Sequence, residues 1–319
     1  MKRFLLVVLC ILAAASTAVP ASAPLVGKHA NYYLDRASYF GLLDSGLEQA
    51  RHTLIGLLHD STNFSPDIYL VGDIAEFNRL VGGRFPDWGA AAAVPYKRLI
   101  ALKSPDKFSV NKPLRELIAH EYAHLALAHR TGLYEPPRWF DEGLAMNVSM
   151  EWGWTDNLAM GKAAIFRQFI SLADIEKVNR LNRAQAEIAY SESFLAVKYF
   201  IDRYKPDVVN TFLDEIAHGH SVDSALSASV GGTQAEFDKE FHDYLEQRYN
   251  VSSLFMDTFW FWVLLAFVLV IGGVLKYRQR RKYYKKWEQE ERFQSTDFDY
   301  GDPSHPEKPD EDEDDAWRR

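Results

Sequence analysis

The sequence predicts an α+β fold followed by one membrane-spanning helix, and three observations support this prediction. Short β-rich segments bounded by proline and glycine occur between residues 68 and 102, whereas the chain after Asn111 has mainly helical periodicity. The composition, 47% hydrophobic and 25% charged, is that of a chain able to bury an ordinary core. An uncharged run near the C-terminal end is long enough to cross a bilayer.

The first 21 residues have the three parts of a secretory signal peptide. Lys2 and Arg3 supply a positively charged start, and Phe4–Ala15 is an unbroken apolar stretch. The small residues of Val19-Pro20-Ala21 then offer a cleavage site. We therefore expect residues 1–21 to be removed, the alternative being an uncleaved membrane anchor.

Cysteine content and charge exclude three classes of protein. The single cysteine, Cys10, lies in the predicted signal peptide, so the mature chain would hold neither a disulfide framework nor a cysteine-ligated zinc site. The net charge of −8 is concentrated in residues 287–319, where 13 Asp and Glu face 4 Lys and Arg, a difference of −9. The remainder is therefore near +1, which offers no basic surface for nucleic acid.

The predicted elements follow in chain order. Residues 35–59 have the leucine spacing of an amphipathic helix. Strands are expected at residues 68–71, 90–94 and 98–102, the last two joined at Pro95-Tyr96-Lys97. Helices are expected from Asn111 onward, with breaks at Gly132, Pro136-Pro137, Pro206 and Gly231-Gly232. Residues 22–250 thus form one predicted extracytoplasmic domain.

A second apolar segment, residues 257–275, predicts a transmembrane helix. Its 18 uncharged residues would extend about 27 Å as a helix, which matches a bilayer core. Seven Lys and Arg follow within residues 276–286, so the positive-inside rule places the C-terminal side in the cytoplasm. The prediction is a single-pass type I protein with its domain in the periplasm or outside the cell. Residues 276–319 would be a cytoplasmic tail, first basic and then acidic, and the alternative for the apolar segment is a buried core helix.

The pentapeptide His120-Glu121-Tyr122-Ala123-His124 lies in the middle of a predicted helix. Residues four apart differ by about 40° around a helix, so His120 and His124 project from one face. Two imidazoles one turn apart suit two ligand positions of a tetrahedral Zn²⁺, and Glu121 could reach a water on that metal. The alternative is a core cluster of hydrogen-bonded histidine and glutamate.

A zinc site requires a third protein ligand. The metzincin pattern fails, because Leu127 and Arg130 stand where it needs glycine and histidine. Glu142 is the better candidate, since Pro136-Pro137 marks the start of a second helix that could pack back against the first. Asp141 is the alternative ligand.

His120-Glu121-x-x-His124 together with Trp139-Phe140-x-Glu142-Gly143-Leu144-Ala145 resembles the peptidase MA-like gluzincins, which are thermolysin-related zinc metallopeptidases. The resemblance covers residues 68–249 and implies a zincin-like domain with a small mixed sheet, an active-site helix and a helical lobe. It also implies one Zn²⁺ per chain, with His120, His124 and Glu142 as ligands and Glu121 as general base.

The sequence departs from this family at one position beside the zinc site. Where thermolysin has an aspartate that supports a ligating histidine, four residues after the glutamate ligand, this chain has Met146. Carboxylates of this kind orient ligating imidazoles, so Asn147, Asp141 or a backbone carbonyl would have to replace it.

The predicted function is that of a membrane-anchored zinc peptidase, more specifically an endopeptidase, that acts on a peptide or protein substrate. Glu121 would take the proton of a zinc-activated water. Tyr190 is our hypothesis for the oxyanion donor, with His218 and His220 as weaker candidates. The rivals are an aminopeptidase and a non-catalytic peptide- or protein-binding module that keeps the fold. The sequence leaves the oligomeric state open.

The resemblance also implies a place for the substrate. Gluzincins commonly bind peptide as an added strand at the sheet edge above the zinc helix, and residues 90–94 or 98–102 would offer that edge. The alternative for the alanine-rich segment is an ordinary buried strand.

Overall fold

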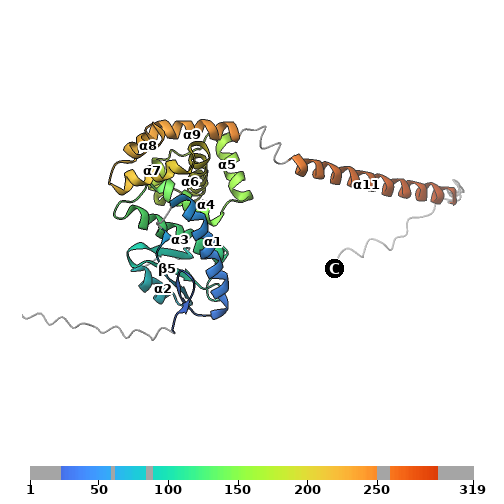
Figure 1. Ribbon diagram of the computed structural model, residues 1–319. Coiled ribbons are helices and arrows are strands. Elements are labelled where there is room, and N and C mark those ends of the chain that lie inside the picture. Colours follow the sequence, from blue (N-terminus) through green and yellow to red (C-terminus); the bar gives the residue numbers. More distant parts are fainter. Residues whose placement is uncertain (1–22, 59–61, 84–88, 250–258, 294–319) are drawn as a thin grey trace, which may run out of the picture. The chain divides into compact units, whose positions relative to one another are not determined.

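The computed structural model describes residues 23–58, 62–83, 89–249 and 259–293 (Figure 1). The chain divides into two units, Met1–Leu254 and Phe255–Arg319. The predicted signal peptide at residues 1–21 and the acidic end of the predicted tail lie outside the described residues.

The first unit begins with a small mixed sheet, as the sequence resemblance implied, and its five strands have the order β1-β2-β3-β5-β4. Strands β2, β3 and β5 are parallel to one another, whereas β1 pairs antiparallel with β2 at one edge and β4 pairs antiparallel with β5 at the other. The strands are β1 (Leu25–Val26), β2 (Asn31–Leu34), β3 (Asp67–Val71), β4 (Ala91–Val94) and β5 (Leu99–Lys103).

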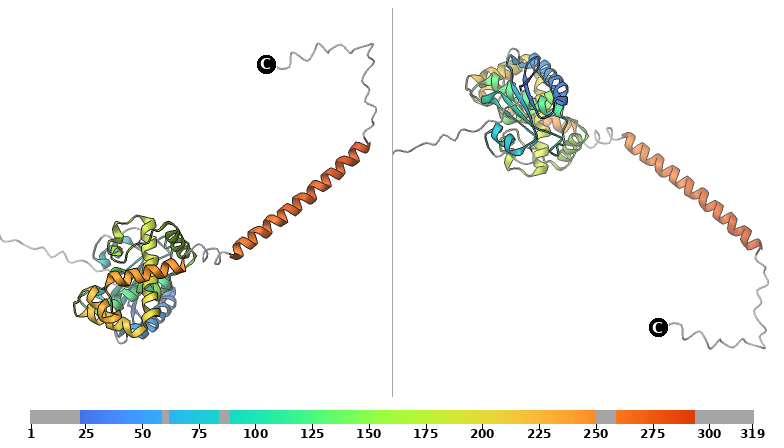
Figure 2. Two further views of the ribbon diagram at one scale, coloured as in Figure 1. Left: turned by 90° about the horizontal axis from the view of Figure 1, so that it is seen from above. Right: turned by 90° about the horizontal axis from the view of Figure 1, so that it is seen from below.

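Side chains alternate between the two faces of this sheet, and each face is covered by helices. Ile68, Leu70 and Ile100 belong to the main core, which also holds residues of α1 (Phe40–Leu58) and α3 (Leu114–Thr131). The intervening residues of the same strands form a smaller core around Phe77 of α2 (Ile74–Val81). The sheet is therefore buried on both faces, with α3 held against β4 and β5 (Figure 2).

Three elements of this unit were not predicted from the sequence. β1 and β2 are only two and four residues long, and α2 is a short helix that Asp73 caps and left-handed Gly82 ends. The predicted helix at residues 35–59 is confirmed from Phe40, with a 3-10 turn, η1 (Ala37–Tyr39), before it. A second 3-10 turn, η3 (Pro95–Lys97), joins β4 to β5 at the expected place.

The chain after α3 forms the predicted helical lobe, whose interior is rich in aromatic side chains. Trp139 stacks with Phe237 at 5.5 Å between ring centroids, and Phe140, Phe200 and Phe212 surround the pair. Helices end or begin at the predicted breaks, including Gly132, Pro206 and Gly231. The elements are α4 (Arg138–Ser149), α5 (Trp154–Phe166), η4 (Asp174–Arg180), α6 (Arg183–Tyr204), α7 (Pro206–Ala217), α8 (Val222–Val230) and α9 (Gln234–Arg248).

The second unit is described as one helix, α11 (Phe259–Phe293). Within it, the segment Phe261–Arg292 is long and apolar enough to cross a membrane, judged by its length and composition. The helix continues well past residue 275, where the apolar run ends and the predicted basic segment begins.

Candidate metal centre

Helix α3 presents both histidines of the pentapeptide to one side. The ring centroids of His120 and His124 are 4.8 Å apart, as expected for residues one helical turn apart. The helix is anchored by Ile118, Tyr122 and Ala126, which are fully buried against the sheet and α1. The polar face of α3 is therefore held in a fixed direction by the packing of its apolar faces.

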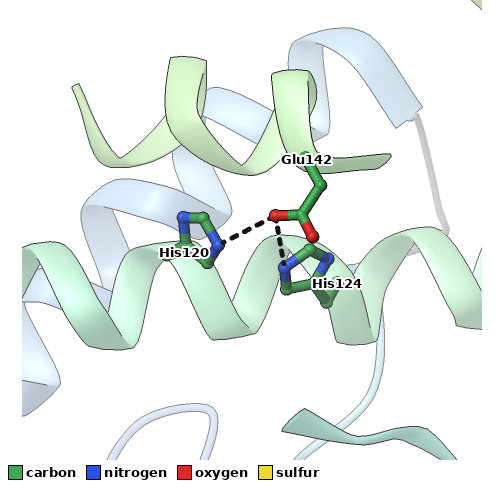
Figure 3. Close-up of side chains that lie close together, drawn as sticks. All are labelled: His120, His124 and Glu142. Atoms are coloured by element: carbon green, nitrogen blue, oxygen red, sulfur yellow. Dashed lines mark ion pairs between the residues drawn. The ribbon is translucent and has the colours of Figure 1, made fainter. Parts of the chain in front are cut away.

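Helix α4 brings Glu142 opposite the two imidazoles (Figure 3). Its Oε2 lies 3.7 Å from Nε2 of His120 and 4.0 Å from Nε2 of His124. A Cβ at Gly143 would lie 2.1 Å from the carbonyl oxygen of Ser193, so only glycine permits this approach of α4 to α6. The glycine next to Glu142 thus helps to set the depth at which α4 packs.

Each imidazole also has a carboxylate on its other nitrogen. Nδ1 of His124 lies 2.7 Å from Oδ1 of Asp141, and Nδ1 of His120 lies 3.0 Å from Oε1 of Glu151. The second contact is an ion pair without good hydrogen-bond alignment. With Nδ1 of each ring beside a carboxylate, the Nε2 lone pair of each ring can face a metal. Asp141, the alternative ligand, supports His124 in this arrangement.

Glu151 is a residue that the sequence reasoning missed. It lies beyond the end of α4, where Met150 adopts a left-handed conformation with φ of 60° and turns the chain back. Its side chain is only 6% exposed and is held by Lys112 and by the hydroxyl of Ser149. Glu151 therefore provides the carboxylate that is missing at Met146. Asn147, proposed for this role, instead donates to the carbonyl oxygens of Gly143 and Phe194.

The electrostatics of the cluster favour a bound cation. Burial lowers the pKa of His120, but Glu142 and Glu151 outweigh it and raise the pKa to about 10. Burial likewise opposes the ionised form of Glu151, yet His120 and Lys112 lower its pKa to about 2. A metal ion between the imidazoles and Glu142 would supply the positive charge that these carboxylates stabilise.

Formal charges lead to the same conclusion. Four carboxylates, those of Glu121, Asp141, Glu142 and Glu151, face two permanent cations, Lys112 and Arg138. With both histidines neutral, two negative charges remain, which a divalent ion would neutralise. Arg138 contacts Oε1 of Glu142 at 3.2 Å, which leaves Oε2 directed to the histidines.

The donor set also has dimensions that suit a metal. The ligand atoms of His120, His124 and Glu142 all lie within 4.8 Å of one another. Donors in a tetrahedral zinc site with bonds near 2.1 Å are separated by about 3.4 Å. The two distances from Glu142, 3.7 and 4.0 Å, are close to this value, and the widest separation would have to shorten by about 1.4 Å at most. These three residues could therefore hold a metal ion.

Glu121 lies between the candidate metal ligands, His120, His124 and Glu142, and the edge strand β4. Burial raises the pKa of Glu121, whereas the two histidines and the backbone N–H of Ala93 lower it. Lys103 N–H donates to the carbonyl of Ala90, so by antiparallel alternation the N–H and C=O of Ala91 and Ala93 point to the side of β4 that pairs with no described strand. The sheet edge next to the zinc-site helix α3 is therefore β4. The alternative at residues 98–102 is wrong, because these residues belong to β5, which lies between β3 and β4.

Tyr190, on α6, lies close to Glu142 of the candidate metal site. Burial and the nearby Glu142 raise the pKa of its phenol, while a hydrogen bond from Arg138 lowers it. The flanking Ser191, Glu192 and Ser193 are buried away from solvent.

The two weaker candidates for the oxyanion donor have other partners. His218 and His220 follow α7 and are exposed. Their Nδ1 atoms contact the carbonyl of Asp214 and the carboxylate of Glu215, respectively.

Comparison with known families agrees with this geometry. The Peptidase MA superfamily matches residues 85–247, which contain β4, the metal cluster and the helical lobe. The chain therefore belongs to the Peptidase MA superfamily, and its first unit has a peptidase-like fold. A comparison with curated proteins finds no match.

Proposed function

We propose that this protein is a membrane-anchored, zinc-dependent peptidase. The observation that carries the proposal is the convergence of His120, His124 and Glu142, with Glu121 between them and β4, the edge strand of the described sheet. Three protein ligands are typical of catalytic zinc, whereas structural zinc prefers four. Because Glu121 is next to the cluster but is not part of it, it is available for proton transfer.

The side chains have distinct parts in the proposed reaction. Zn²⁺ bound by His120, His124 and Glu142 would act as a Lewis acid and lower the pKa of an attacking water. The carboxylate of Glu121 accepts the proton of that water and later delivers it to the leaving amine. Asp141 and Glu151 hold the imidazoles in orientation through Nδ1, and Arg138 holds the outer oxygen of Glu142.

The substrate would bind as an extended strand along β4. The N–H of Ala91 and the C=O groups of Ala91 and Ala93 lie along this edge, whereas the N–H of Ala93 is bonded to Glu121, and the small alanine side chains allow a peptide backbone to approach closely. The open edge then presents a peptide bond near Glu121. Because backbone groups supply most of the affinity in this mode, side-chain pockets are left to determine specificity.

Metal removal tests the proposal directly. We expect the full chain, purified in detergent, to contain one zinc and to cleave casein or peptides from a mixed library. A chelator should abolish cleavage, and added zinc should restore it, as measured by metal analysis and mass spectrometry of the products. A chain that binds zinc and peptides without cleaving them would be a binding module instead.

Replacement of Glu151 by Gln should weaken zinc binding about 10- to 100-fold, the range found for outer partners of metal ligands. The amide cannot stabilise the Nδ1–H of His120 with a full charge. Competition with a chromophoric chelator measures the affinity. The matched control is Glu48→Gln, which breaks a similar pair, with Nδ1 of His29 at 2.6 Å, outside the cluster. Equal zinc affinities of the two variants would contradict this role.

Tyr190→Phe should lower kcat by about 10²-fold with unchanged zinc content, if its hydroxyl stabilises the oxyanion. The phenol lies near Arg138 and Glu142, and phenylalanine keeps its packing. Steady-state kinetics and metal analysis give the answer. Full turnover in this variant would remove Tyr190 from the mechanism.

Membrane anchoring is the second part of the proposal. Helix α11 supplies an apolar segment long enough to span a bilayer, and the basic residues after it favour a cytoplasmic location for that end. The first unit would then lie in the periplasm or outside the cell. Reporter fusions to the C-terminus test this orientation, and an extracytoplasmic reporter signal would reverse it.

A further inference from the structure

Helix α11 continues without a break for about five turns beyond its apolar run. The continuation is rich in both cations and aromatic side chains, and its side chains are exposed. Both kinds of side chain therefore project from the same continuous helix, and their positions around its axis follow from their spacing in the sequence.

Five of the seven cations in residues 276–286 lie on one face of this helix, whereas Lys276 and Arg280 lie among the aromatic residues of the opposite face. At 100° per residue, four aromatic residues span an arc of about 120°, and five cations span an opposite arc of about 140°. The ring centroids of Tyr284 and Trp287 are 6.4 Å apart, consistent with a shared face. The aromatic face holds Tyr277, Tyr283, Tyr284 and Trp287, and the basic face holds Arg278, Arg281, Lys282, Lys285 and Lys286.

Most of this positive charge is not neutralised within the helix. Among the described residues of α11, ion pairs form only near its end, between Lys286 and Glu290 and between Arg292 and Glu288. Arg281 lies over the ring of Tyr277 at 5.8 Å, an interaction that keeps its charge. A concentrated positive field therefore begins within one turn of the apolar segment.

We propose that the basic face of α11, residues 278–286, binds anionic phospholipid head groups. Lys and Arg have long apolar stems that can lie in the interface while their charged ends reach lipid phosphates. Tyr and Trp suit the same depth, since their rings are apolar and their polar groups can remain hydrated. The apolar run immediately before this face would place it at the membrane surface.

This inference rests on the proposed membrane anchor, so the experiment must test the two separately. Full-length protein is purified in detergent, mixed with equal amounts of phosphatidylglycerol and phosphatidylcholine, and analysed by native mass spectrometry. The test variant carries R278Q, R281Q, K282Q, K285Q and K286Q. The matched control removes five exposed cations of the first unit, R79Q, K177Q, R183Q, K198Q and K239Q.

We expect the wild type and the control to retain phosphatidylglycerol over phosphatidylcholine by about tenfold or more, and the test variant to lose this preference. A wild type without preference, or a test variant that keeps it, would overturn the proposal. A dimer mass without excess anionic lipid would indicate that a second copy occupies this helix instead. Alkaline carbonate extraction of reconstituted protein tests the anchor, because release from vesicles would contradict the anchor itself.

Discussion

Glu121→Gln is expected to reduce peptide hydrolysis by about 10²- to 10⁴-fold while the chain keeps its zinc. The amide is nearly isosteric with the carboxylate but cannot accept the proton of the attacking water. The metal ligands of the proposed site, His120, His124 and Glu142, are untouched by this change. Metal analysis and single-turnover cleavage of a labelled peptide measure the two effects on one sample.

The control for this variant lies on the same helix. Glu116→Gln changes a carboxylate in the first turn of α3, one turn before His120, and should leave zinc content and hydrolysis close to those of the wild type. If Glu121→Gln retains wild-type hydrolysis, the binding-module function replaces the peptidase function. If Glu121→Gln loses zinc as well, Glu121 helps to hold the metal and is not a general base alone.

Glu142→Gln should abolish both zinc binding and hydrolysis. The change removes the charged oxygen that faces Nε2 of His120 and of His124, and a neutral amide is a poor zinc ligand. The loss of affinity should exceed the 10- to 100-fold expected for Glu151→Gln, because Glu151 acts only through an imidazole.

Thermal unfolding gives a measurement of Glu142→Gln that does not depend on activity. A ligand at 1,000 times its Kd stabilises the folded state by about 4 kcal/mol, so zinc should raise the Tm of the wild type by several degrees. The variant should show no such shift. Glu187→Gln, at an exposed position of α6, is the control and should respond to zinc as the wild type does. A zinc-dependent rise in Tm for Glu142→Gln would exclude Glu142 as a ligand.

The local parts of the candidate site could be predicted because they depend on helical periodicity. His120 and His124 share a face in any α-helix, and Gly132 and Pro137 mark the helix limits that bring Glu142 back to them. Glu151 could not be predicted in this way. It reaches His120 through a left-handed turn at Met150, and no periodic pattern connects residues on opposite sides of such a turn.

The same distinction applies to the sheet. Strands β3, β4 and β5, at residues 67–71, 91–94 and 99–103, were recognisable from composition. Strands β1 and β2 are too short to give a pattern. The position of β4 at the edge was also undetermined, because strand order results from which chain segments pair rather than from the residues of one strand.

The amino-acid sequence by itself therefore determined the α+β class, the two-histidine helix, the Glu142 motif and an apolar run long enough for a membrane span. These properties arise from neighbouring residues whose spacing is set by the geometry of a helix or a strand. The tertiary structure alone decided that β4 is an edge strand of the described sheet, that Arg138 lies beside Glu142, and that Glu151 and Lys112 support His120. Those contacts join residues far apart in the chain, and they form only when the helices and the sheet pack into a common core.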